Sequence, residues 1–135
     1  MTVRRYQYPG VLREIESMVG ATDLDFRMTG GFVTARETAD WARAWTGNSE
    51  AVSDDFLFFA DDWSGAQVGF WLLQPAVPLE QQPVLIFSSE SDYSVIARDL
   101  GDFLVLLAHG IAPHAAMDGW SEEESLDKWI EANVR

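Results

Sequence analysis

Two histidines, His109 and His114, are the side chains of this 135-residue chain best suited to general acid–base catalysis or to metal binding. Gly110 and Pro113 stand between them, so one regular helix cannot present both rings on the same face. Asp118 would come close to His114 only if that stretch were helical. The chain has no cysteine and no third nitrogen ligand at a fixed spacing. The pattern is more typical of two loop histidines than of a metal site, and we expect no metal and no other cofactor.

The adjacent carboxylates of Asp61 and Asp62 are a second candidate, for glycoside hydrolysis or for binding a divalent cation. Adjacent residues on an extended chain point to opposite faces, so the two groups cannot easily share one substrate. Aspartate is also common in turns, which explains the pair without any chemistry. Ser64 lacks the glycines of a nucleophile elbow, because Asp62 and Ala66 occupy those positions. The sequence therefore predicts that the protein is not an enzyme.

The distribution of charge indicates binding instead. The chain has 22 acidic residues against 9 basic ones, which gives a formal net charge of -13. Such a field repels nucleic acid and acidic membrane surfaces, so neither is expected as a partner. The negative charge suits binding of a basic protein, although a role in solubility alone would also account for this charge. Between Arg43 and Arg98 there is no lysine or arginine, whereas eight acidic residues fall in that interval: Glu50, Asp54, Asp55, Asp61, Asp62, Glu80, Glu90 and Asp92.

Length and composition fit one domain covering residues 1–135, with 47% hydrophobic content to form its core. The lack of cysteine fits a reducing compartment. No signal peptide is visible, and no apolar run approaches the roughly 18 residues of a membrane span. We expect a soluble, cytoplasmic protein that is a monomer or a weak dimer.

Helices are expected towards both ends of the chain. Apolar residues recur at helical spacing over residues 9–20. Thr34 and Glu37 have the spacing of a capping box and should open a helix that ends near residue 47. Asp99 should cap a third helix, which is apolar almost all round and is therefore expected at the centre of the core. A capping box at Ser121 should open a last helix.

The middle of the chain favours strands. Its apolar runs are residues 56–60, 68–73 and 84–87, and a hairpin turn at 61–65 separates the first two. These runs are apolar on both faces, so the sheet should be covered on both sides. A short strand at 24–28 should turn and pair with 32–33. The elements together predict an α+β fold, with a central, mostly antiparallel sheet packed against helices near both termini.

Trp63 stands apart from the other aromatic residues of this region, which are ordinary core residues on central strands. It occupies the predicted hairpin tip between Asp62 and Ser64, where burial is least expected. Its ring is either an interface anchor among carboxylates or folds back over the edge of the sheet.

The order of these features resembles one known family. An aspartate-rich hairpin, an apolar strand, an acidic loop and a Phe-Leu helix follow one another, after Trp41 and Trp45, in the segments 59–65, 68–71, 83–91, 95–97 and 99–104. Over roughly residues 37–110 this order resembles the SUKH superfamily, which includes the yeast cell-wall synthesis regulator and many bacterial immunity proteins.

The resemblance implies a mixed α+β domain with an antiparallel sheet and a binding role. Bacterial members typically neutralise a cognate toxin, often a nuclease or deaminase, by protein contact. Because nucleic-acid-directed toxins tend to be basic, this agrees with the acidic charge, and we expect an immunity protein that binds a basic toxin. The alternatives are a regulatory or scaffold protein with several partners, and a small hydrolase or ligand-binding domain that uses the two histidines. The expected partner-binding residues are Asp54, Asp55, Asp61, Asp62, Trp63, Glu90, Asp92 and Tyr93.

Overall fold

The computed structural model describes most of the chain, namely residues 7–20, 26–51, 54–62, 65–74, 76–88, 93–109, 111, 113, 128 and 130–132. Its elements follow one another as α1 (Gly10–Gly20), β1 (Arg27–Met28), α2 (Ala35–Thr46), β2 (Phe56–Asp61), β3 (Gln67–Trp71), the 3-10 helix η1 (Leu79–Gln81), β4 (Val84–Phe87), β5 (Tyr93–Ala97) and α3 (Leu100–Ala108).

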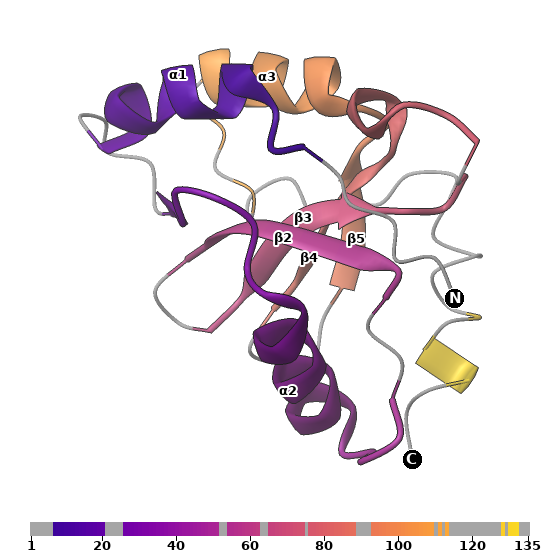
Figure 1. Ribbon diagram of the computed structural model, residues 1–135. Coiled ribbons are helices and arrows are strands. Elements are labelled where there is room, and N and C mark those ends of the chain that lie inside the picture. The colour runs from indigo at the N-terminus through magenta and orange to yellow at the C-terminus, as the bar shows by residue number, and fades with distance from the viewer. Residues whose placement is uncertain are drawn as a thin grey trace.

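The strands form one antiparallel sheet in the order β1-β2-β3-β4-β5, so each strand pairs with its neighbours in the sequence. Figure 1 shows this sheet as the middle layer, with α1 and α3 side by side on one face and α2 on the other. The predicted α+β fold is confirmed, and so is the expectation that the sheet is covered on both sides.

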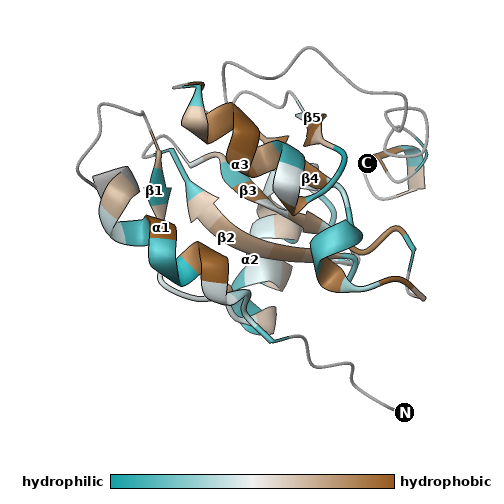
Figure 2. Cartoon of the chain, turned by 90° about the horizontal axis from the view of Figure 1, so that it is seen from above, coloured by the Kyte–Doolittle hydropathy of each residue, from teal (hydrophilic) through white to brown (hydrophobic). Residues whose placement is uncertain are grey.

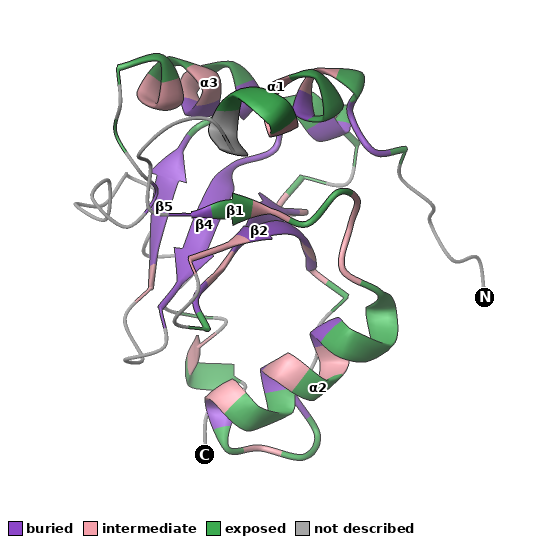
Figure 3. Cartoon of the chain, turned by 90° about the vertical axis from the view of Figure 1, so that its left-hand side faces the viewer, coloured by how far each residue is buried: buried purple, intermediate pink, exposed green. Residues whose placement is uncertain are grey.

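Each face of the sheet has its own apolar core. The core under α1 and α3 includes Phe59 and Phe103, whereas the core under α2 includes Phe58 and Phe87. Figure 3 shows β2, β4 and β5 as largely buried strands between more exposed helices, whereas the edge strand β1 is not buried. The apolar runs of the sequence lack polar alternation because both of their faces are removed from water.

Two helices begin at the capping residues that the sequence predicts. The Thr34 hydroxyl accepts a hydrogen bond from the Glu37 amide at 3.1 Å, and the Asp99 carboxylate accepts one from the Asp102 amide at 2.8 Å. Helix α2 ends at Gly47, whose φ of 69° lies in the left-handed region that favours glycine. Within the described residues, the Glu37 carboxylate does not return the second bond of a capping box.

The expected pairing of the first strand with residues 32–33 was wrong. Strand β1 pairs with β2, with Arg27 opposite Asp61. The chain after β1 then stays on the same edge of β2, where the Thr29 amide donates to the Phe59 carbonyl and the Val33 amide to the Phe58 carbonyl. Following this edge satisfies backbone groups that a local hairpin would have left to water.

Two further differences concern the second half of the chain. The expected strands did not include β5, whose pairing with β4 buries Ser94 as well as its apolar residues. The central position expected for α3 was also wrong, because Val105 is 54% exposed and only Leu100 and Phe103 of this helix are buried. Figure 2 shows that α3 is apolar along much of its length, although it lies in an outer layer.

The expected last helix is described only in part. Lys128 and residues 130–132 are helical, and Ile130 packs against the core under α2. Its expected capping residue, Ser121, lies outside the described residues. None of the described helices combines the length and the hydrophobicity that crossing a membrane requires.

Candidate functional site

The two connections that the sequence marks as acidic leave the sheet at the same end. Strands β2 and β4 end on one cross-strand row, and β3 and β5 begin on it. We call this row the loop end of the sheet, and it consists of Arg27, Asp61, Gln67, Phe87 and Tyr93. The β2–β3 and β4–β5 connections therefore start and finish side by side.

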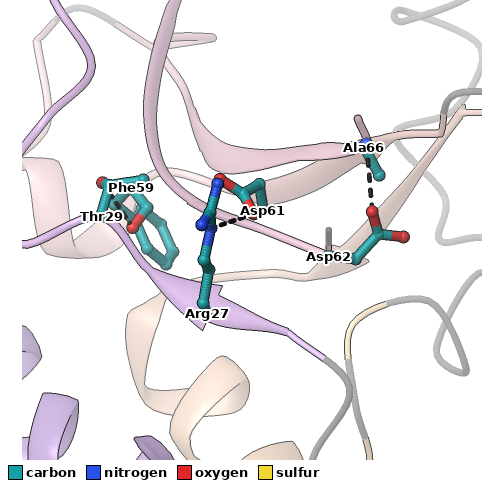
Figure 4. Close-up of polar contacts among 6 residues, drawn as sticks. All are labelled: Arg27, Thr29, Phe59, Asp61, Asp62 and Ala66. Atoms are coloured by element: carbon teal, nitrogen blue, oxygen red, sulfur yellow. Dashed lines mark hydrogen bonds and ion pairs between the residues drawn. The ribbon is translucent and has the colours of Figure 1, made fainter. Parts of the chain in front are cut away.

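Asp61 forms an ion pair at the loop end. The Nε of Arg27 donates to Oδ1 of Asp61 at 2.7 Å, as Figure 4 shows, and the side chain of Asp61 is only 13% exposed. Arg27 lies outside the interval without bases, but strand pairing brings it there. An ion pair with one solvent-exposed partner contributes about 1 kcal/mol or less to stability. It does, however, offset part of the negative charge at this point.

Asp62 has a separate structural contact. Its carboxylate accepts a hydrogen bond from the Ala66 amide at 3.1 Å across the hairpin, and Figure 4 shows it turned away from the contact of Asp61. This confirms the turn role that the sequence predicts for Asp62. The two carboxylates have different partners and do not form a pair around one substrate.

Tyr93 is half-buried at the start of β5. Its ring packs against Trp45 and Phe87, with centroid distances of 6.2 and 6.5 Å. Trp45 also donates from Nε1 to the Ser88 carbonyl oxygen at 2.9 Å. Helix α2 thus holds both ends of the β4–β5 connection. Sequence reasoning named Trp45 as part of the SUKH resemblance but did not connect it with this loop.

Asp54 and Asp55 lie at the opposite end of β2, where Phe56 pairs with Trp71. Asp55 precedes Asp61 by six residues and Asp54 by seven, which at about 3.3 Å per residue amounts to roughly 20 Å or more along β2. The structure therefore does not bring them together with the loop end. Their charges act on a partner there only through the long-range field.

Asp55 is expected to make stability depend on pH. Burial raises its pKa above the ordinary value of 3.8, and the charge of Asp54 raises it further. Because the pKa is higher in the folded than in the unfolded state, the charged form costs stability above the folded pKa, and this cost disappears below the unfolded pKa. Asp55→Asn should therefore raise the free energy of unfolding at pH 7, by about 1 kcal/mol at most.

Thermal unfolding at about pH 7 and pH 3 checks this, because the gain should vanish at the lower pH. Asp40→Asn serves as the matched control, since Asp40 is exposed on α2. A lower Tm for Asp55→Asn than for the unmodified protein at pH 7 would contradict the expected cost of the buried charge.

The remaining candidates are placed only in part. Trp63, Glu90 and Asp92 lie outside the described residues, as does His114, so their roles stay predictions. His109 is exposed at the end of α3, and its Nδ1 lies 2.8 Å from the Val105 carbonyl oxygen, which can only accept a hydrogen bond. No group of three or more acidic or histidine side chains gathers in the described part of the chain to hold a metal ion.

A hollow with a volume of about 440 Å³ lies next to the loop end, and we call it the α2 hollow. Its walls are the segment 29–34, Glu37 and Trp41 of α2, and Phe58, Asp61 and Gln67 of the sheet. The rings of Trp41 and Phe58 stand nearly perpendicular at 4.7 Å. Sequence reasoning missed this hollow because its walls come from segments that only the folded chain brings together.

Comparison of the chain with protein-family models, with curated proteins and with solved structures finds no match. The resemblance to the SUKH superfamily therefore stays a prediction, and the function has to be argued from the geometry of the loop end.

Proposed function

We propose that the protein is a non-enzymatic binding module whose loop end binds a basic protein. As the SUKH resemblance implies, this partner would be a nucleic-acid-directed toxin that the protein neutralises as an immunity protein. The observation that carries the proposal is the strand register. It brings the connection that follows Asp61 and the connection whose sequence contains Glu90 and Asp92 to one row of the sheet.

The packing that fixes the ends of these two connections favours a binding surface. Both faces of the sheet are covered, and Trp45 holds the backbone of Ser88 and the ring of Tyr93. Loops whose ends are already fixed lose less conformational freedom when a partner binds, which improves affinity without new contacts.

The charge of the chain adds a kinetic argument. A net charge of -13 attracts a basic protein over a distance and accelerates its association, most strongly at low ionic strength. Partly buried aromatic residues such as Tyr93 can then supply apolar contact area after encounter. The proposal therefore predicts fast, salt-dependent association.

The double variant Asp61→Asn/Asp62→Asn tests the role of the loop end. Asparagine keeps an oxygen that can accept from Arg27 and Ala66, so the structural contacts can persist while two charges are removed. We expect the association rate constant for the partner to fall by roughly 3- to 10-fold at low salt and its salt dependence to weaken. Rapid-mixing kinetics over a salt series measure both effects.

The matched control is Glu14→Gln/Asp54→Asn, which removes the same charge from α1 and from the opposite end of β2. On a logarithmic scale, this control should lower the association rate constant by less than half as much as Asp61→Asn/Asp62→Asn does. Equal slowing by the two double variants would contradict a binding site at the loop end. Association of the unmodified protein that does not respond to salt would contradict charge steering altogether.

The partner itself can be sought by co-expression with the products of neighbouring genes. We expect one of them to co-purify, to inhibit growth when expressed alone and to be neutralised by this protein. Co-purification with several non-toxic proteins would instead support the regulatory or scaffold alternative.

A further inference from the structure

Two carboxylates from different elements border the α2 hollow. Glu37 belongs to the first turn of α2, and Asp61 ends β2. The Glu37 side chain is exposed, and within the described residues its carboxylate has no ion pair or hydrogen bond. Asp61 already accepts a hydrogen bond from the guanidinium of Arg27. Among the described residues, the hollow thus offers a carboxylate without a partner beside one that binds a guanidinium group.

The start of α2 at the hollow does not make it an anion site. The amides of a helix N-terminus are equivalent to about half a positive charge. The full negative charge of Glu37 outweighs that, even though Arg27 offsets part of the charge of Asp61, and the Glu37 amide is already bonded to the Thr34 hydroxyl. A phosphate or a carboxylate would therefore be repelled, whereas a cation would be attracted.

The aromatic wall of the hollow, formed by Trp41 and Phe58, favours a guanidinium over an ammonium group. Trp41 is partly buried, and its ring packs edge-to-face with Phe58 at one side of the hollow. A planar guanidinium stacks on aromatic faces and pairs with carboxylates through a fork of donors, whereas an ammonium group is more strongly hydrated. The volume of about 440 Å³ lies within the usual range of ligand pockets and exceeds the needs of one side chain.

From these contacts we infer that the α2 hollow is a subsite for an arginine side chain of the basic partner, with Glu37 as its main ion-pairing residue and Trp41 as its stacking surface. The inference rests on the proposed function, because a basic protein would supply the arginine. It adds to that function a specific recognition contact beside the loops.

The subsite can be tested without the partner. The probe is N-acetyl-arginine amide, titrated into the full chain while the indole N–H signal of Trp41 is followed by NMR. We expect saturable binding in the millimolar range, because one side chain supplies only a small part of an interface. The neutral analogue N-acetyl-citrulline amide should bind at least 10-fold more weakly, and N-acetyl-lysine amide several-fold more weakly.

Glu37→Gln should weaken binding of the arginine probe at least 5-fold. It leaves the backbone amide that Thr34 caps, so α2 should form normally. The matched control Glu50→Gln removes the same charge outside the hollow, at another exposed position. Equal binding of arginine and citrulline, or equal losses in the two variants, would overturn the subsite.

The same variants separate this inference from the proposed function. If Glu37→Gln abolishes binding of the arginine probe and also weakens binding of a basic protein partner, the subsite is supported as part of the interface. If the partner binds through the loop end while the probe fails to bind, the subsite is wrong and the proposed function stands. If the probe binds but no basic protein does, the guanidinium site is supported and the proposed function fails.

Discussion

Gly69→Ala should destabilise the protein by about 3 kcal/mol or more, because the added methyl group has no space. A Cβ at this position would lie 2.6 Å from the Cα of Phe58 and closer still to the carbonyl oxygen of Leu57. Both are backbone atoms of β2, so no rotation of a side chain relieves the overlap. The pairing of β2 with β3 would have to open next to its irregularity between Phe58 and Ala60.

Urea unfolding measures this loss as a lower midpoint. Gly10→Ala is the matched control, because a Cβ on Gly10 meets no atom within 4 Å. Its effect should stay within about 0.5 kcal/mol, or be stabilising at the start of α1. Equal midpoints for the two variants would mean that β2 and β3 can separate at Gly69 at little cost.

The parts of the fold that sequence reasoning predicted are those with local causes. Thr34, Gly47 and Asp99 determine the ends of their helices through contacts within a few residues. The strands β2, β3 and β4 follow from apolar runs long enough to be recognised. Strand β5 was missed because a buried Ser94 interrupts a short run. The partner of β1 was missed because Arg27 and Asp61 are paired by the sheet and not by their separation along the chain.

The candidate site divides in the same way. Composition identified the acidic interval, and strand register places both of its loop connections at one end of the sheet. Composition could not show that Arg27, from outside that interval, pairs with Asp61 inside it. Nor could it show that Trp45 forms a hydrogen bond with Ser88, 43 residues further along the chain. The charge of the loop end is therefore less one-sided than the sequence suggests, and Glu37, outside the interval, becomes the exposed acid beside it.

Trp41→Ala should cost about 4 kcal/mol of folding free energy. The indole of Trp41 packs against Trp45, Phe56, Phe58 and Phe87, with centroid distances between 4.7 and 6.3 Å. Truncation would leave a cavity between α2 and the sheet that surrounding rings cannot fill without moving. Chemical unfolding should therefore show a large drop in stability, and the α2 hollow should lose its aromatic wall.

The conservative variants separate the ring of Trp41 from its polar atom. Its Nε1 is buried and has no hydrogen-bond partner in the described part of the chain. A buried donor without a partner costs about 1–3 kcal/mol, so Trp41→Phe removes a penalty as well as some contact area. Trp41→Phe should consequently cost less than about 1 kcal/mol or be stabilising. Trp45→Phe should cost about 1–2 kcal/mol more, because it removes the bond from Nε1 to the Ser88 carbonyl at 2.9 Å.

The same pair connects stability with binding. Trp45→Phe should also weaken binding of the partner, because the β4–β5 connection loses the hydrogen bond from Trp45 to Ser88 that holds its start. Trp41→Phe should leave this connection in place, since Trp45 still packs against Phe87 and Tyr93. Unfolding midpoints and partner affinity for the two variants check both expectations. If Trp41→Phe proves as costly to stability as Trp45→Phe, the Nε1 of Trp41 forms a hydrogen bond in solution and is part of the polar framework of the site.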